Sequence, residues 1–208
     1  MKKFLILNLL LLIVLVNLTG CSNGPNNGLY PVMPPAGSPQ NQPVIYEDFE
    51  NTADCWAWNS GDSMTITTEN YHPSLVTDPH VPIKNHSLRL ITKANLGGGG
   101  IQPGDHSWDI DLNPNGTNTK LTFWVYGVPD DGNKSGIGIE IWDVQTNYVK
   151  NLWTNNFGSD NIFSPNQWTK LWVPLPNDGS VDLHHINKIQ VQVYCSGTYY
   201  FDDMMAEP

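Results

Sequence analysis

The sequence predicts an all-β fold built as a two-sheet antiparallel sandwich. Its 208 residues include 18 Gly, 16 Pro, 8 Trp and 8 Tyr, a composition that favours turns and aromatic-rich strands over long helices. Apolar and polar residues alternate with a period of two along residues 44–208. Each alternating segment has one aliphatic face, and two facing sheets bury such faces together.

Residues 1–20 are predicted to be a secretory signal that lies outside the fold. Two lysines precede an apolar run from Phe4 to Val16, which is shorter than the ~20 residues of a bilayer-spanning helix. The sequence Leu18-Thr19-Gly20-Cys21 resembles the lipobox of bacterial lipoproteins. The resemblance implies cleavage before Cys21, a lipid on that cysteine and a membrane-anchored, extracytoplasmic protein at the cell surface. The alternative is an ordinary transmembrane anchor.

Residues 21–43 are predicted to be an extended linker. The segment has no charged residue and six prolines, so it cannot bury enough apolar surface to fold. Proline-rich chains extend by roughly 3 Å per residue. We therefore expect a stalk that holds the domain of residues 44–208 away from a membrane.

Eight strand segments are predicted in residues 44–208. In the segment 121–126, Leu121, Phe123 and Val125 share one face, which we assign to the core. The segments are Val44–Glu50, Met64–Thr68, Ser87–Thr92, 121–126, 138–142, 168–175, 189–195 and Tyr199–Met205. The run Gly97–Gly100 is interpreted as a loop or bulge at which the backbone comes close to another group.

Large aromatic side chains occupy the face of several segments that is predicted to point away from the core. They are interleaved with carboxylate and amide side chains, and an exposed row of aromatics marks an interaction surface. For any single ring, the alternative is that it caps the sandwich under a long loop. The candidate binding residues are Trp124, Tyr126, Glu140, Trp142, Gln190, Gln192 and Tyr194.

Several function classes are disfavoured by the sequence. The net charge of −10 opposes nucleic-acid binding, which needs a basic face. Glu140 and Asp143 are three residues apart and therefore point to opposite faces of a strand, which opposes a catalytic acid and base pair. The adjacent His184 and His185 have no further ligands at metal spacing and are interpreted as a solvated turn.

Five sequence pieces carry a family resemblance over residues 44–207. They are Tyr46-Glu47-Asp48-Phe49-Glu50, Ser87-Leu88-Arg89-Leu90, Leu121-Thr122-Phe123-Trp124-Val125-Tyr126-Gly127, Gln167-Trp168-Thr169-Lys170-Leu171 and Tyr199-Tyr200-Phe201-Asp202-Asp203-Met204. In this order they resemble the β-jelly-roll carbohydrate-binding modules of cellulases and hemicellulases, nearest to family 11 and related to families 4, 22 and 30. The resemblance implies a jelly-roll β-sandwich, a glycan cleft on the concave sheet, a structural calcium and no catalysis. The strand with Trp168 and Trp172 is expected on the convex sheet.

The function predicted on this basis is non-catalytic binding of a β-linked polysaccharide of the glucan, xylan or mannan type. Rings of Trp and Tyr stack on the C–H faces of such sugars, while amides and carboxylates bind the hydroxyl groups. Glycoside hydrolases are candidate partners. Two alternatives stay open: a surface adhesion or assembly protein that uses the aromatic face for a protein partner, and a polysaccharide hydrolase or lyase.

Two further features of the domain are predicted. The resemblance implies a structural Ca²⁺ near the chain ends, and clustered acids there point to Glu50 with Asp202 or Asp203 as its ligands. Export favours a disulfide between the two remaining cysteines, Cys55 and Cys195, with two unpaired thiols as the alternative. If the first and last strands pair with Glu47 opposite Asp203, these cysteines face each other just beyond the strands.

Overall fold

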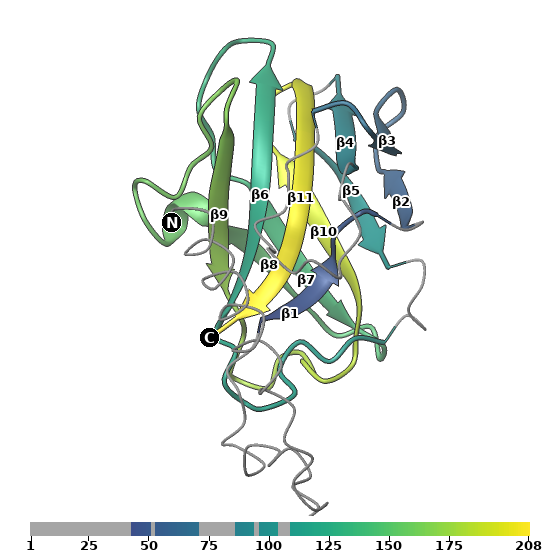
Figure 1. The fold of residues 1–208 in the computed structure, drawn as a ribbon, viewed down its shortest axis with the longest axis vertical. Helices are drawn as coiled ribbons and strands as arrows, with labels where there is room; N and C mark the ends of the chain where they lie inside the picture. The colour runs from purple at the N-terminus through teal and green to yellow at the C-terminus, as the bar shows by residue number, and fades with distance from the viewer. Residues whose placement is uncertain (1–42, 51–52, 71–85, 94–95, 104–108) are drawn as a thin grey trace, which may run out of the picture. The chain divides into compact units, whose positions relative to one another are not determined.

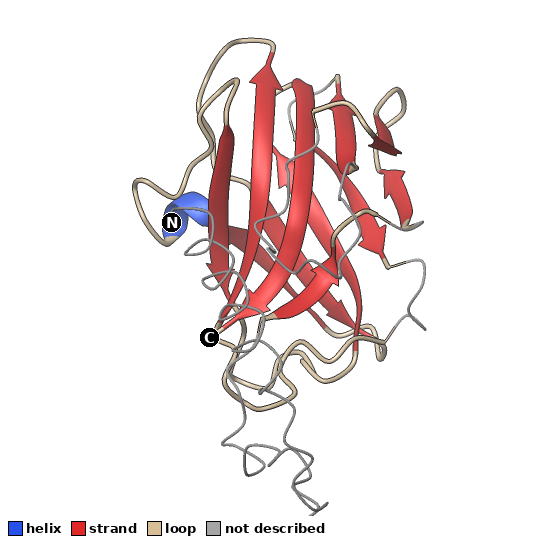
Figure 2. Ribbon diagram, in the orientation of Figure 1, coloured by secondary structure: helices blue, strands red, loops and turns tan. Residues whose placement is uncertain are grey.

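Two antiparallel β-sheets make up the part of the chain that the computed structural model describes, namely residues 43–50, 53–70, 86–93, 96–103 and 109–208 (Figures 1 and 2). The strands are β1 (Val44–Glu47), β2 (Asp54–Ala57), β3 (Ser63–Thr67), β4 (Ser87–Thr92), β5 (Gly97–Gln102), β6 (Lys120–Pro129), β7 (Gly138–Asp143), β8 (Tyr148–Trp153), β9 (Trp168–Pro174), β10 (Ile186–Val193) and β11 (Gly197–Glu207). A short 3-10 helix, η1 (Thr154–Asn156), follows β8. None of the described helical segments is long and apolar enough to cross a bilayer.

The strand order confirms the predicted two-sheet antiparallel jelly-roll sandwich. Sheet A has the order β3-β4-β11-β6-β9, and β1 also pairs with β11. Sheet B has the order β2-β5-β10-β7-β8. Consecutive strands therefore often belong to different sheets, which places residues that are distant in sequence side by side (Figure 1).

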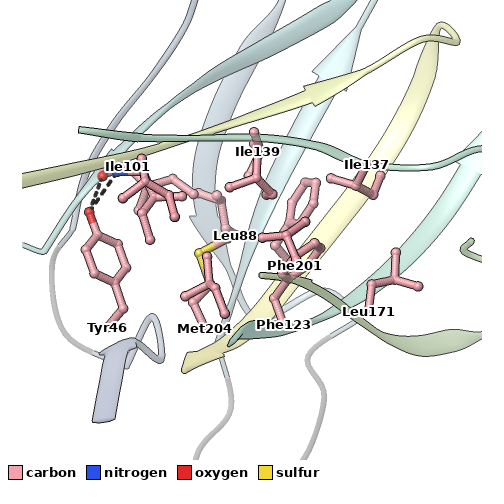
Figure 3. Close-up of a cluster of buried hydrophobic side chains, with 14 of the residues drawn as sticks. Tyr46, Leu88, Ile101, Phe123, Ile137, Ile139, Leu171, Phe201 and Met204 are labelled. Carbon is pink, nitrogen blue, oxygen red and sulfur yellow. Dashed lines mark hydrogen bonds between the residues drawn. The ribbon is translucent and has the colours of Figure 1, made fainter. Parts of the chain in front are cut away.

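The apolar core lies between the two sheets, as the period-two pattern predicts. Phe123 and Phe201 of sheet A and Ile139 of sheet B are fully buried within it (Figure 3). Tyr46 ties the sheets together, because its hydroxyl donates to the carbonyl oxygen of Ile101 at 2.7 Å and accepts from the amide of Ile189 at 3.0 Å. Burial raises the pKa of Tyr46 well above its ordinary value, so the hydroxyl keeps its proton for this bond.

All eight predicted strand segments overlap observed strands, but β2, β5 and β8 were not predicted. The interpretation of Gly97–Gly100 as a loop or bulge is wrong, because these glycines form most of β5, which lies between β2 and β10. The expected close approach is present. A Cβ on Gly99 would lie 2.1 Å from the carbonyl oxygen of Trp56, and one on Gly100 would lie 2.2 Å from its ring. Glycines carry no alternating side chains, so the pattern that marks a strand is missing here.

The predicted disulfide is also wrong, because Cys55 and Cys195 are both free. The assumed strand register is correct for Val44 opposite Ala206, although a bulge follows before Glu47. Beyond β1, however, the chain crosses to sheet B. There Cys55 lies opposite Ile101, which in turn lies opposite Ile189 on β10. Cys195 lies six residues further along, or about 20 Å of extended chain, whereas bridged Cα atoms are within about 7 Å.

Free thiols have a measurable consequence. We expect both Cys55 and Cys195 to react with an alkylating agent when the full chain is unfolded without a reductant, because no disulfide protects either one. Peptide mass spectrometry identifies the two modified positions. Detection of a disulfide-linked peptide pair that contains Cys55 and Cys195 would show that the bridge exists and would contradict this strand arrangement.

Candidate functional site

The outer face of sheet B carries most of the candidate binding residues. The strand register aligns its outward side chains in three rows across the sheet. The rows are Lys188, Trp142 and Tyr148; Trp56, Gly100, Gln190 and Glu140; and Trp58, Gly98, Gln192, Gly138 and Trp153. Glycine, amide and carboxylate residues thus lie on β5, β10 and β7, and aromatic residues lie at the β2 and β8 sides and on β7 itself, as Trp142. We call this surface the aromatic face.

Two stacked ring pairs border the aromatic face on the side of β7 and β8. Trp142 stacks on Tyr148 with ring centroids 4.1 Å apart, and Trp153 stacks on Tyr194 with centroids 4.2 Å apart. Gly138 makes room for the second pair, since a Cβ there would lie 3.0 Å from the ring of Trp153. Tyr194 is 53% exposed and Tyr148 is 41% exposed, so both pairs are accessible to a ligand.

Two tryptophans of the β2 region border the opposite side. Trp56 is on β2, and its ring lies against Gly100 of β5. Trp58 follows that strand, and its backbone amide donates to the carbonyl oxygen of Gly98 at 3.0 Å. A Cβ on Gly98 would come within 2.8 Å of the Trp58 ring. The glycines of β5 therefore let both half-exposed indoles lie close to the sheet.

A hydrogen-bonded polar network lies between these aromatic borders. Glu140 accepts hydrogen bonds from Nε2 of Gln192 at 2.9 Å and from Nε1 of Trp142 at 3.3 Å. With its amide nitrogen toward Glu140, Gln190 donates to that carboxylate at 2.7 Å and accepts from Nζ of Lys188 at 3.2 Å. The network offers both donors and acceptors to a ligand.

The structure brings together five of the seven predicted binding residues: Glu140, Trp142, Gln190, Gln192 and Tyr194. It places Trp124 and Tyr126 on β6 of sheet A, away from the other five. Tyr126 packs against Trp168 and Tyr200 there, with centroids 5.9 and 6.0 Å apart. The strand of Trp168 and Trp172, β9, also belongs to sheet A, and its place on a convex sheet stays a prediction.

Sequence reasoning missed Trp56, Trp58, Tyr148, Trp153 and Lys188. The spacing of two between Trp56 and Trp58 was an available signal, because it places both rings on one face of an extended chain. The signal for β8 was weaker, since Tyr148 and Trp153 are separated by a register shift in the ladder with β7.

Glu140 and Asp143 lie in different surroundings, as their spacing of three residues predicts. Asp143 is buried at the end of β7, whereas Glu140 lies on the aromatic face. Burial alone would raise the pKa of Asp143, but hydrogen bonds from Asn147, Asp182 and Gln145 lower it. Asp143 is thus an ionised carboxylate that holds loops in place.

His184 and His185 form a solvated turn before β10, as interpreted from the sequence. Each ring contacts an aspartate through Nδ1: His184 is 2.9 Å from Asp111, and His185 is 2.9 Å from Asp109. The hydrogen bond and charge of Asp109 raise the pKa of His185. These pairs link the turn to the segment that precedes β6.

The predicted calcium ligands lie near the point at which the pairing of β1 with β11 ends, where Glu47 is opposite Met204. Asp202 and Asp203 are buried on β11. Glu50 accepts from the backbone amide of His86 at 2.8 Å, and its second oxygen is 3.2 Å from the imidazole. Among the described residues, no group of three or more His, Cys, Asp or Glu side chains is arranged to hold a metal ion. The lipidation candidate Cys21 lies outside the described residues.

A polar pocket of about 880 Å³ lies at one end of the sandwich, between loops that include Asn113, Asn118, Asn177 and His184. None of the described residues that line it is Trp, Tyr or Phe. The pocket therefore offers hydrogen bonds but no stacking surface. The aromatic face combines both kinds of contact and is the stronger candidate site.

Comparisons with known proteins support the fold. No protein-family model and no curated protein matches the chain. Among solved structures, an exo-β-agarase matches with a TM-score of 0.51 and 14% identity, over 79% of this chain and 25% of that chain. A family 30 carbohydrate-binding module of a cellulosomal cellulase of Clostridium thermocellum matches with a TM-score of 0.47 and 16% identity, over 79% of this chain and 96% of the module.

The family 11 carbohydrate-binding module of another cellulosomal cellulase of Clostridium thermocellum has a TM-score of 0.43 and 12% identity, over 80% of this chain and 94% of the module. At these identities a structural likeness shows the fold alone. The strand order shows that this chain folds as a two-sheet jelly-roll β-sandwich, and the match to the exo-β-agarase agrees with a shared fold.

Proposed function

We propose that this protein binds a β-linked polysaccharide on the aromatic face of sheet B and does not catalyse a reaction on it. The observation that carries the proposal is the arrangement of six rings, Trp56, Trp58, Trp142, Tyr148, Trp153 and Tyr194, on both sides of the network of Glu140, Gln190 and Gln192. Large exposed aromatics are costly to solubility and are expected where they meet a ligand.

The chemistry of a β-glycan fits this arrangement. Its sugar rings present flat C–H faces that stack on indole and phenol rings, and its hydroxyl groups both donate and accept hydrogen bonds. The two amides can do the same, and the carboxylate of Glu140 is a strong acceptor. A purely apolar protein partner would remove water from Glu140, Gln190 and Gln192 without replacing its hydrogen bonds, which costs free energy.

The state of Glu140 supports a binding role over a catalytic one. Its two oxygens already accept hydrogen bonds from Gln192 and Trp142. A general acid or base must reach the proton that it transfers, whereas both oxygens of Glu140 are held by donors of the protein itself. The geometry therefore favours Glu140 as a fixed acceptor.

Affinity electrophoresis of the full chain in gels with soluble β-glucan, xylan or mannan tests the proposal. We expect at least one polymer to retard the protein, with no release of reducing sugars during prolonged incubation. Normal migration in every polymer would remove the polysaccharide assignment and favour a protein partner. Reducing-sugar release would instead identify a hydrolase.

We also propose that Cys21 carries a lipid that anchors the domain to the cell surface, where glycoside hydrolases could share its polysaccharide. The supports are the lipobox-like residues 18–21 and the uncharged, proline-rich segment 21–43. Mass spectrometry of the N-terminal peptide from cells tests the anchor. An unmodified N-terminus that begins at Met1 would contradict it.

A structural Ca²⁺ held by Asp202 or Asp203 with backbone carbonyls completes the proposal. Both carboxylates are buried, and a cation offsets the Coulombic cost of holding such charges close together. The contact of both Glu50 oxygens with His86 makes Glu50 the weaker ligand.

Chelation tests the calcium proposal. We expect EGTA to lower the melting temperature of the full chain and added Ca²⁺ to restore it, because a ligand that binds only the native state stabilises it. Asp203→Asn is expected to reduce the size of this shift. An unchanged melting temperature on chelation would show that no Ca²⁺ stabilises the fold.

A further inference from the structure

Both faces of the Trp142 ring are covered in this structure. Tyr148 stacks on one face with an interplanar angle of 13° and a centroid distance of 4.1 Å. The ammonium nitrogen of Lys188 lies 3.8 Å from the Trp142 centroid. Because Tyr148 fills the first face at van der Waals distance, the ammonium lies over the second. A sugar ring can stack on Trp142 only after Lys188 moves.

Lys188 is held on the aromatic face without a carboxylate partner in direct contact. No ion pair among the described residues includes it. The carboxylate whose charge acts on it, Glu140, already accepts hydrogen bonds from Gln192 and Trp142. Burial lowers the pKa of Lys188, and the charge of Glu140 offsets this only in part. The ammonium is thus partly buried, and its hydrogen-bond acceptor is the amide oxygen of Gln190 rather than a carboxylate.

A ligand that displaces this ammonium from the ring must replace the cation–π attraction that is lost. A hydroxyl group offers a neutral hydrogen bond, whereas a carboxylate offers a charge-assisted one that is roughly twice as strong. The centroid of the Trp56 ring lies 6.0 Å from the same nitrogen, so Trp56 keeps the ammonium close to the place where a sugar would stack on Trp142. The ligand that matches this site best therefore combines a stacking sugar with a nearby anionic group.

We infer that Lys188 is a specificity-determining residue that makes the aromatic face select β-glycans with carboxylate groups, such as uronic acid substituents, over neutral ones. The inference rests on the proposed polysaccharide binding and adds a ligand class to it. Lys188 covers Trp142 in the free protein and moves to the carboxylate of the bound glycan.

Two polymers that differ only in charge test the inference. Glucuronoxylan is compared with the same polymer after reduction of its carboxyl groups to primary alcohols, by calorimetric titration of the full chain at low ionic strength. We expect the acidic polymer to bind about tenfold more tightly, the gain of one hydrogen bond to a charged group. Lys188→Met keeps the side-chain length and removes the charge. It is expected to abolish the preference and to improve binding of the reduced polymer, because no cation–π attraction then opposes displacement of the side chain from Trp142.

Lys150→Met is the matched control. The ammonium nitrogen of Lys150 lies 5.5 Å from the centroid of the Tyr148 ring. The substitution therefore removes the same charge near the same aromatic pair without changing the contact of Lys188 with Trp142. We expect this variant to keep the preference for the acidic polymer. Melting curves confirm that each variant folds, and Lys188→Gln replaces the Met variant if the latter does not.

The outcomes separate the inference from the proposed function. Equal binding of the two polymers by the wild type overturns the inference, as does an equal loss of preference in both lysine variants. Binding of neutral glucan, xylan or mannan without a gain from carboxylates overturns the inference and leaves the proposed function standing. Binding of no polymer at all overturns both.

Discussion

Replacement of Trp142 by alanine is expected to weaken glycan binding by about tenfold to a hundredfold while the melting curve changes little. Central aromatic residues of a binding surface contribute about 1–3 kcal/mol each, and 1.4 kcal/mol corresponds to tenfold in affinity. Trp142 projects from β7 onto the aromatic face, where it contacts Tyr148 and Glu140. The substitution therefore removes stacking surface and one donor to Glu140 but no part of the buried core.

Trp172→Ala is the matched control for this prediction. Trp172 is 37% exposed on β9 of sheet A, so its truncation is chemically identical but lies on the other sheet. We expect it to leave glycan affinity unchanged in the same calorimetric titration. A loss of binding in Trp172→Ala equal to that in Trp142→Ala would show that the site is placed on the wrong sheet. Loss of the thermal transition in Trp142→Ala would show that this ring belongs to the core.

The same substitution at two neighbouring glycines of β5 is expected to affect stability at one and glycan affinity at the other. Gly99→Ala is expected to destabilise the fold by about 1–3 kcal/mol, the usual range for overpacking of a filled site. Its Cβ would lie 2.1 Å from the Trp56 carbonyl oxygen, and backbone cannot move aside without disturbing the β2–β5 ladder. Chemical denaturation measures the loss of unfolding free energy.

Gly100→Ala is expected to fold and to bind glycan weakly. Its Cβ would lie 2.2 Å from the ring of Trp56, a 38% exposed side chain that can swing into solvent. The displaced ring then no longer lies along the aromatic face, so affinity falls as it would in Trp56→Ala. Full affinity in Gly100→Ala, or equal stability in Gly99→Ala, would contradict the placement of these two glycines.

The sequence was sufficient to predict the fold class, because alternation is a local signal that burial between two sheets imposes on each strand. The segment 121–126 is an example, since Leu121, Phe123 and Val125 are all fully buried. Strand β5 could not be found in this way. Four glycines show no alternation of apolar and polar side chains. Two of them make room for the rings of Trp56 and Trp58, and only the strand pairing shows that these rings lie there.

The sequence also could not predict which of the two sheets each strand joins. Trp124 and Trp142 have the same local pattern, a ring that alternates with buried aliphatic residues, yet they lie on different sheets. Local periodicity says which face of a strand is exposed and not which sheet the strand joins. The predicted disulfide failed for the same reason, since the register of β1 with β11 does not continue to Cys55 after the chain enters sheet B.

The most direct test of the account follows the tryptophan indole N–H signals in a two-dimensional ¹H–¹⁵N NMR spectrum while a bound glycan is added. The binding site is predicted to be the aromatic face, so the signals of Trp56, Trp58, Trp142 and Trp153 are expected to shift with saturation. The signals of Trp124, Trp168 and Trp172 on sheet A are expected to stay in place. Shifts confined to these three tryptophans would contradict the central claim and move the site to sheet A.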